Sequence, residues 1–194
     1  MNVPLGPKPG NPGLPGCLAK VEQLEQIIAE LLDAMQNYSP VPQTGQTVSY
    51  ATGDDGDLKK GVVWPNPRFI DHEDGTVTDN LTGLMWTKNA QQFQNGMLWP
   101  DGLAACNDLF FAGYDDWRLP NLRELHSLID YGHYSPALPA DHPFTNVQDY
   151  FYWSSTTPLF FSTTDAWAVR LGDGWVFYTV HEYPFFVWCV RGGN

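Results

Sequence analysis

The chain has 194 residues, 43% of them hydrophobic, and a formal net charge of −12 at pH 7. This acidic balance argues against a nucleic-acid partner or a polybasic membrane contact. No apolar run approaches the ~20 residues that cross a bilayer, so no membrane insertion is expected. The first ten residues, MNVPLGPKPG, contain no apolar segment typical of a secretory signal, and we expect the chain to be a fragment of a longer protein.

Glycine recurs at every third position near the start, at Gly10, Gly13 and Gly16. Two Gly-X-Y triplets with proline in the Y position are typical of a collagen triple helix, whose axis admits only glycine. The phase breaks between Gly6 and Gly10, and so short a repeat cannot hold a triple helix alone. Residues 1–16 are therefore interpreted as a collagen-like tail or, alternatively, as a flexible Pro/Gly-rich segment.

A heptad pattern follows over residues 17–38. Its apolar side chains alternate spacings of three and four, as at the a and d positions of a coiled coil; they are Val21, Leu24, Ile28, Leu31 and Met35. Ile27 and Leu32 broaden the stripe, which favours a state above the dimer, and a collagen-like tail has three strands. The pattern predicts a homotrimer, and the alternative is an amphipathic helix packed on its own domain. Residues 39–48, which contain Pro40 and Pro42, are predicted to be a linker.

Residues 49–194 are predicted to form one globular domain that begins with short strands. The segment VSYATGDDGDLKKGVVW reads as a hairpin with GDDGDLKKG as its loop. Two more strands are expected on either side of the DHEDG turn, and NLTG makes a turn before a strand at Leu84. Four carboxylates here could suggest calcium, but their spacing misses the EF-hand pattern and tight turns also favour Asp and Gly. They are Asp71, Glu73, Asp74 and Asp79. We expect turn chemistry, with no metal and no cofactor.

Two helices are predicted next, each with a proline at its first position and a glycine at its end. The first, within WPDGLAACNDLFFAG, begins at Pro100 and places Leu103, Cys106 and Phe110 on one face. The second, within LPNLRELHSLIDYG, begins at Pro120. Its inward side chains are Leu122, Leu125, Leu128 and Ile129. Between the helices, Arg118 follows Trp117 and two aspartates, and it is interpreted as a structural ion-pair and stacking residue. His126 is interpreted as a surface or satisfied core group.

Aromatic strands dominate the rest of the chain. They are expected in DYFYWSSTT, in AWAVRLGDGWVFYTV, where LGDG is a hairpin turn signal, and in FFVWCVRGG. Strands, two helices and then a run of antiparallel strands predict an α+β domain.

The segments TGLMW, DWRLP, YWSST and CVRGG occur in this order over about residues 65–192. Together they resemble the C-terminal domain family of the Legionella collagen-like protein, a bacterial surface adhesin. The resemblance implies a C-type-lectin-like fold and an extracellular location, at the bacterial surface or secreted. It also implies binding of sulfated glycosaminoglycans or other anionic polysaccharides in attachment and biofilm formation. The EPN, QPD and WND motifs of calcium-dependent lectins are absent from the sequence, so a calcium-bridged sugar site is unsupported.

The resemblance also implies one disulfide bond, between Cys106 and Cys189, because the extracellular setting permits it and this fold ties the first helix to the last strand. Cys17 is then the odd cysteine, expected to be reduced or bonded outside this chain. No Ser/His/Asp triad or catalytic carboxylate pair stands out, so no enzyme is expected.

A polyanionic ligand requires a local basic cluster on this acidic chain. After the stem and motif residues are set aside, six basic side chains remain as candidates: Lys59, Lys60, Lys88, Arg123, Arg68 and Arg170. The adjacent Lys59 and Lys60 are the first choice, and a solvated loop pair is the alternative. Two other functions stay open: a structural cap that trimerises a collagen-like stalk, and a protein-binding display domain.

Overall fold

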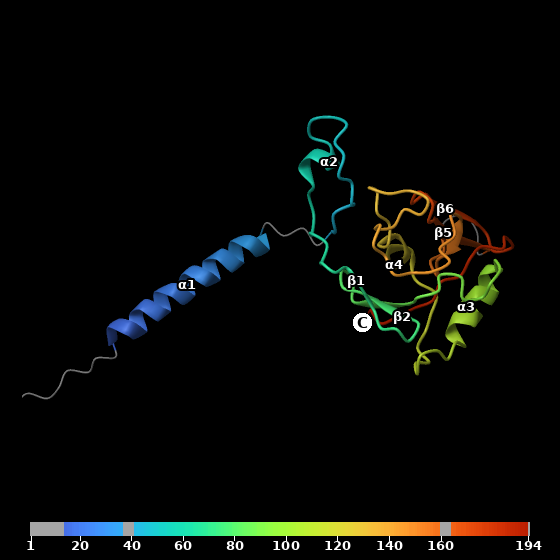
Figure 1. Ribbon diagram of the computed structural model, residues 1–194, viewed down its shortest axis with the longest axis horizontal. Coiled ribbons are helices and arrows are strands. Elements are labelled where there is room, and N and C mark those ends of the chain that lie inside the picture. The colour runs from blue at the N-terminus through green and yellow to red at the C-terminus, as the bar shows by residue number, and fades with distance from the viewer. Residues whose placement is uncertain (1–13, 37–40, 160–163, 194) are drawn as a thin grey trace, which may run out of the picture. The chain divides into compact units, whose positions relative to one another are not determined.

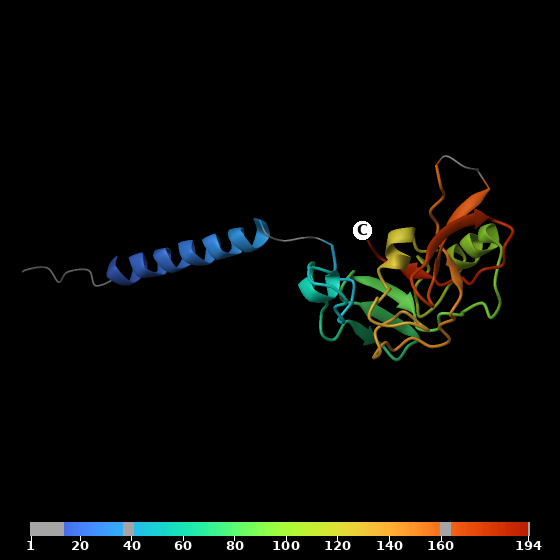
Figure 2. The same ribbon diagram turned by 90° about the horizontal axis from the view of Figure 1, so that it is seen from above.

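A computed structural model describes residues 14–36, 41–159 and 164–193. The chain divides into two compact units, Met1–Pro40 and Val41–Asn194. The second unit thus includes residues 41–48, which the sequence analysis assigned to the linker. Most of the predicted collagen-like tail, residues 1–13, lies outside the described residues. Figures 1 and 2 show the elements of each unit in chain order, from blue to red.

The first unit contains one long helix, α1 (Leu14–Gln36), which begins two residues before the end of the predicted tail. Its apolar stripe is exposed along the described side chains: Val21 is 45%, Leu24 57% and Ile28 54% accessible. The side chains of Cys17, Leu31 and Met35 lie outside the described part of the helix. The helix is confirmed, whereas its association into a coiled coil stays a prediction.

The first sheet of the second unit has four antiparallel strands in the order β1-β2-β3-β7. The strands are β1 (Phe69–Asp71), β2 (Thr76–Asp79), β3 (Leu84–Thr87) and β7 (Val190–Arg191). The turns predicted at DHEDG and NLTG join β1 to β2 and β2 to β3. The last strand of the chain pairs with β3, so the fourth strand of the sheet comes from residues about a hundred positions away.

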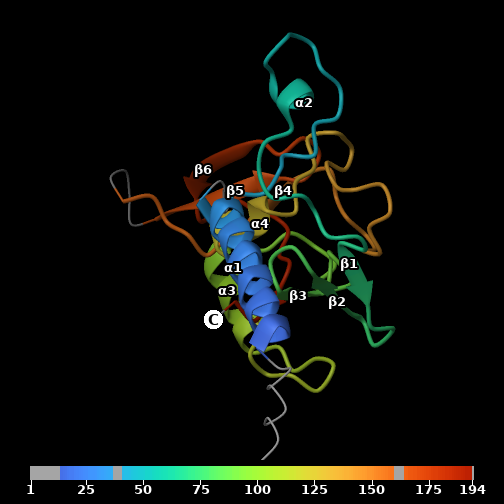
Figure 3. The ribbon, with the colours of Figure 1, turned by 90° about the vertical axis from the view of Figure 1, so that its left-hand side faces the viewer.

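The second sheet has three antiparallel strands, β4 (Phe151–Trp153), β5 (Asp165–Arg170) and β6 (Val176–Val180), in chain order. The predicted LGDG turn connects β5 to β6, whose register pairs Ala168 with Phe177. The two sheets occupy different parts of the unit (Figure 3). With two antiparallel sheets and a few short helices, the α+β class is confirmed, and the C-type-lectin-like relationship stays a prediction.

The two domain helices exist but are shorter than predicted. Helix α3 (Trp99–Asn107) carries Pro100 in its first turn, as expected. Because it ends at Asn107, Phe110 leaves the helical face and is exposed, so its predicted inward position was wrong. Helix α4 (Leu122–His126) begins after a capping box in which Asn121 accepts from the Glu124 N–H. Pro120 therefore precedes the cap, and its predicted place at the first helical position was also wrong.

The hairpin predicted over residues 48–64 is absent. The segment instead contains a short helix, α2 (Asp55–Leu58), capped by the Asp54 side chain, which accepts from the Asp57 N–H. Because Asp54 also accepts from the backbone N–H groups of Tyr50 and Ala51, these bonds hold the chain in a local turn. The predicted loop thus forms a helical turn, and Tyr50 and Ala51 of the predicted first strand donate to Asp54 instead of to a partner strand.

The core consists of two apolar clusters. One gathers Trp86, Trp188, Leu125 of α4 and Leu128 and Ile129 just after it, so these predicted inward side chains are buried although two of them lie beyond the helix. The other packs α3 against the β4–β6 sheet, and Figures 1 and 2 show α3 beside β5 and β6. Within it, Cys106 and Cys189 form the predicted disulfide bond, with their Cα atoms 5.5 Å apart.

Candidate ligand-binding surface

Lys59 and Lys60 follow helix α2 directly. Lys59 has a left-handed backbone (φ 47°) and ends the helix, its N–H donating to the carbonyl of Asp55. Its own carbonyl accepts from the Gln43 side chain at 2.5 Å. Both lysine side chains are exposed, and neither has an ionic partner among the described residues. The backbone is thus held on both sides while the two ammonium groups stay available to a ligand.

Lys88 follows strand β3 and is already paired. Its Nζ lies 2.5 Å from Asp71 on β1, and this hydrogen bond lowers the pKa of the Asp71 carboxyl. A polyanion that bound Lys88 would compete with Asp71, so Lys88 presents a smaller net attraction than Lys59 or Lys60.

Arg68 precedes strand β1 and is buried, with only 5% of its surface exposed. It forms an ion pair with Asp79, whose Oδ1 lies 3.3 Å from its Nε, and donates to the Ser127 carbonyl at 2.6 Å. Its guanidinium also stacks over the Trp64 ring, 4.3 Å from the centroid. These contacts join β1, β2 and the end of α4, which is a structural role.

Arg170 ends strand β5 and holds Asp173 of the hairpin turn through two side-chain hydrogen bonds. The first of these contacts measures 2.8 Å, and the pair lowers the pKa of Asp173. The guanidinium lies 5.0 Å from the Trp175 ring centroid. Arg170 therefore stabilises the β5–β6 turn.

Arg123 lies in the first turn of α4. Its backbone N–H donates to the capping Asn121 side chain, while its side chain is exposed and has no ionic partner among the described residues. A free guanidinium can donate two parallel hydrogen bonds to a sulfate or carboxylate. Lys59, Lys60 and Arg123 are thus the candidates that the structure leaves unpaired, on two separate elements.

Arg118 has the predicted structural role, and Arg191 of the CVRGG segment has a similar one. Arg118 forms paired hydrogen bonds with Glu124, at 2.7 and 2.8 Å, and donates to the Gly192 carbonyl. Arg191 pairs with Asp116 and stacks on the Tyr114 ring at 3.7 Å. Because the backbones of Arg118 and Val190 also exchange hydrogen bonds, these contacts fasten the DWRLP and CVRGG segments to each other.

The candidate calcium carboxylates are engaged in turns. Asp74 accepts from both the N–H and the hydroxyl of Thr76, and Asp79 accepts from the Leu81 N–H and the Thr82 hydroxyl. His126 is half-buried and lies 3.0 Å from the Tyr131 hydroxyl, within hydrogen-bond distance. Within residues 14–36, 41–159 and 164–193, no three His, Cys, Asp or Glu side chains are grouped as metal ligands.

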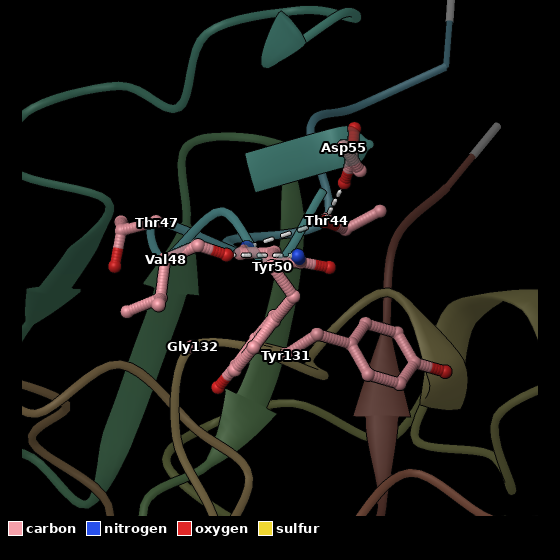
Figure 4. A pocket seen from close by; sticks show the side chains of 8 residues that line it. Thr44, Thr47, Val48, Tyr50, Asp55, Tyr131 and Gly132 are labelled. Carbon is pink, nitrogen blue, oxygen red and sulfur yellow. Dashed lines mark hydrogen bonds between the residues drawn. The ribbon is translucent and has the colours of Figure 1, made fainter. Parts of the chain in front are cut away.

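Sequence reasoning missed a pocket at one edge of the second unit. It has a volume of about 420 Å³ and is open to solvent, and its lining comes from residues 44–55 together with Tyr131 and Gly132. Figure 4 shows the Tyr50 side chain extending from the 44–55 segment toward Gly132. Part of this lining had been assigned to a linker, and linkers give no reason to expect a pocket.

A comparison with known protein families matches residues 75–191 to the family described as the Lcl C-terminal domain. The chain belongs to the Lcl C-terminal domain family. This is the C-terminal domain family of a collagen-like surface adhesin, as the sequence motifs indicated. A search of curated proteins finds no match. In the described residues, no helix is both long and apolar enough to cross a membrane.

The span matched to the Lcl C-terminal domain family contains both cysteines of the disulfide bond and the arginines that fasten the motifs. Lys59, Lys60 and most of the pocket lining precede it. The family match therefore accounts for the domain framework, while the unpaired lysines and the pocket belong to the segment in front of it.

Proposed function

We propose that this chain is the trimeric tip of a collagen-like surface adhesin, secreted or displayed on a bacterial cell, and that it binds sulfated glycosaminoglycans or similar anionic polysaccharides. It acts in attachment and biofilm formation and catalyses no reaction. The observation that supports the proposal best is the pair of exposed, unpaired lysines, Lys59 and Lys60, in a domain of an adhesin family.

The exposed apolar stripe of α1 supports the trimer. Val21, Leu24 and Ile28 are about half accessible on the single chain, and burying their apolar surface in a coiled coil is favourable. Three chains then carry three copies of the Lys59–Lys60 loop. Because a glycosaminoglycan repeats its sulfates along one polymer, binding at the second and third copies is intramolecular and raises the overall affinity.

The net charge of −12 does not prevent such binding. At physiological salt the screening length is about 8 Å, so a sulfate in contact with a lysine is largely shielded from more distant carboxylates. Among the described residues of the second unit, Lys59, Lys60 and Arg123 have no ionic partner and are free to act at short range. The interaction is expected to weaken steeply as salt rises, as in other contacts between basic groups and polyanions.

The test is elution from immobilised heparin in a salt gradient. Lys60→Glu and the double variant Lys59→Glu/Lys60→Glu should elute at lower salt than the unaltered chain, with an unchanged melting temperature. Lys20→Glu is the matched control for Lys60→Glu, since it changes by the same two charges an exposed lysine on α1 that has no ionic partner among the described residues. Equal elution of Lys60→Glu and Lys20→Glu would show that only the overall charge matters, and the assignment to the loop would be wrong.

Ile28→Asp tests the multivalent part of the proposal. A charge at this a position opposes burial of the stripe, so light scattering should report a monomer instead of a homotrimer. The monomer should elute from heparin at lower salt although its loop is intact. If the unaltered chain forms a trimer but does not bind heparin even at about 50 mM salt, where electrostatic contacts are strongest, the structural-cap function replaces the adhesin function.

A further inference from the structure

The pocket missed by the sequence analysis lies next to the Lys59–Lys60 loop in the chain but has a different chemistry. We name it the tyrosine pocket, after Tyr50 on one side and Tyr131 on the other. Its volume of about 420 Å³ falls in the range of about 300–1,000 Å³ that small-molecule sites occupy. In Figure 4 both tyrosine side chains lie below the 44–55 segment, with Thr44 and Asp55 above them.

Around the pocket, Gly45 and Gly132 lie so close to neighbouring atoms that only glycine fits at these positions. A Cβ atom on Gly45 would lie 2.1 Å from the Asp130 carboxylate, and one on Gly132 would lie 2.6 Å from the Gly45 carbonyl oxygen. The Tyr131 N–H donates to the Thr44 carbonyl at 2.9 Å across the same contact. The two walls are therefore fastened to each other before any ligand arrives, which lowers the ordering cost of binding.

Two polar side chains of the lining, Asp55 and Gln46, offer hydrogen-bond acceptors. Asp55 accepts from the Thr44 hydroxyl through one carboxylate oxygen, and its other oxygen has no partner within the described residues. Gln46 donates its side-chain N–H to the Val48 carbonyl, and its amide oxygen is an acceptor. A ligand with several hydroxyl donors on a ring matches this set.

The aromatic groups add flat apolar surface. Tyr50 is 84% exposed, while the Tyr131 hydroxyl is held 3.0 Å from His126, which limits movement of its ring. Aromatic rings bury large apolar area at a small cost in side-chain entropy. Such rings can stack against the C–H face of a pyranose while the acceptors bind its hydroxyls.

We propose that the tyrosine pocket binds an uncharged pyranose, as a subsite separate from the basic loop. The pocket lining contains one carboxylate and no lysine or arginine, so it disfavours a sulfated ring, which would carry its negative charge next to Asp55. This inference goes beyond the proposed binding of anionic polysaccharide: one chain would recognise two kinds of glycan surface, through cations at the loop and through stacking in the pocket.

The experiment is saturation-transfer NMR on the full 194-residue chain with methyl β-D-galactopyranoside, methyl β-D-glucopyranoside and methyl α-D-mannopyranoside as probes. A ligand of this size at ordinary ligand efficiency has a Kd of about 1 mM, which this method detects. At least one glycoside should show transfer and should shift the amide signals of Tyr131 and Gly132. Transfer to none of the three, or shifts located elsewhere, would overturn the proposal.

Two variants of the same residue type locate the site. Tyr50→Ala should weaken glycoside binding about fivefold to tenfold through loss of ring contact. Tyr134→Ala is the matched control, because Tyr134 is also 84% exposed but does not line the pocket. Equal behaviour of the two variants would refute the pocket as the site, and both side chains are too exposed for their loss to unfold the domain.

Charge distinguishes a sugar from a cationic ligand. Asp55→Asn keeps an acceptor oxygen, so glycoside binding should change by less than about threefold, since the Coulomb attraction it removes acts only on a charged ligand. If choline shows transfer and the glycosides do not, the pocket is a cation site and the proposal is wrong. Lys59→Glu/Lys60→Glu should leave glycoside binding intact while it lowers heparin retention, so failure of one assignment is separable from failure of the other.

Discussion

Gly45→Ala tests the contact that fastens residues 44–55 to the rest of the second unit. Gly45 has a φ of +87°, in the region that side-chain-bearing residues rarely adopt. Its added Cβ would lie 2.1 Å from Asp130 Oδ1 and 2.8 Å from Trp64 Cη2. Asp130 cannot yield easily, since it is buried and its carboxylate holds the Gly132 N–H at 2.7 Å and His133 at 2.8 Å.

The expected loss of stability is the sum of two effects. Left-handed backbone in alanine costs about 1–2 kcal/mol. Displacing Asp130 breaks a hydrogen bond to a buried carboxylate, which costs about 1–3 kcal/mol. Gly53→Ala isolates the first effect, because Gly53 has a φ of +85° and nothing within 4 Å of the added Cβ. Gly45→Ala should therefore destabilise the protein by about 2 kcal/mol more than Gly53→Ala.

Urea unfolding followed by tryptophan fluorescence measures this difference. Four tryptophans are fully buried, and all belong to the second unit: Trp86, Trp117, Trp153 and Trp188. Hydrogen exchange at the Tyr131 amide, which bonds the Thr44 carbonyl, detects the same loss if the segment opens without unfolding the core. Equal unfolding energies for the two variants, together with unchanged protection of Tyr131, would refute the close contact.

Two further predictions concern the framework. Replacing Cys106 and Cys189 by alanine should lower the free energy of unfolding by about 4–5 kcal/mol in urea titrations, the chain-entropy value for a link across 83 residues; a loss below about 1 kcal/mol would contradict it. The melting temperature should also decrease as the pH is lowered. Burial lowers the pKa of His126 from 6.5, so stability is lost as pH falls below that value, where the unfolded chain binds more protons. Burial raises the pKa of Glu124, but hydrogen bonds from Arg118 outweigh it and lower the pKa below 4.5, so a second loss follows under more acidic conditions. Glu124→Gln should melt lower at pH 7 and lose less in that acidic range, and an identical acid slope would contradict the assignment.

Strands and core faces could be predicted because their signals are local. The DHEDG, NLTG and LGDG turns each join two strands with a few residues, and turn chemistry is carried by those residues themselves. The spacing of Leu125, Leu128 and Ile129 likewise indicates one buried face, and all three are buried. The order of the strands in the first sheet was not predictable in this way, since β7 joins β3 from the far end of the chain.

The errors came where two local signals compete. Asp54 caps a helical turn in a segment that was predicted to be the loop of a hairpin. Pro120 and Asn121 can each begin a helix, and the capping box with Glu124 decided for Asn121. The pocket had no local signal, because its two walls are far apart in sequence and meet through contacts such as those of Gly45 with Asp130 and Gly132.

Local and long-range contacts also determine which candidate ligand residues are paired and which stay free. Arg68, just before β1, pairs with Asp79 on the neighbouring strand β2, and Lys88, just after β3, pairs with Asp71 on β1, beyond β2. Their engagement therefore follows from the arrangement of the sheet and not from sequence spacing. Lys59 and Lys60 stay free because they follow a helix whose acidic residues cap and hold its own backbone. The motifs that identify the family contain the arginines that fasten the framework. Their side chains already donate hydrogen bonds within the domain, so few of their donors are free for a ligand. In the function proposed above, recognition therefore depends mainly on the segment that precedes the family match, and variation there is expected to change binding without changing the framework.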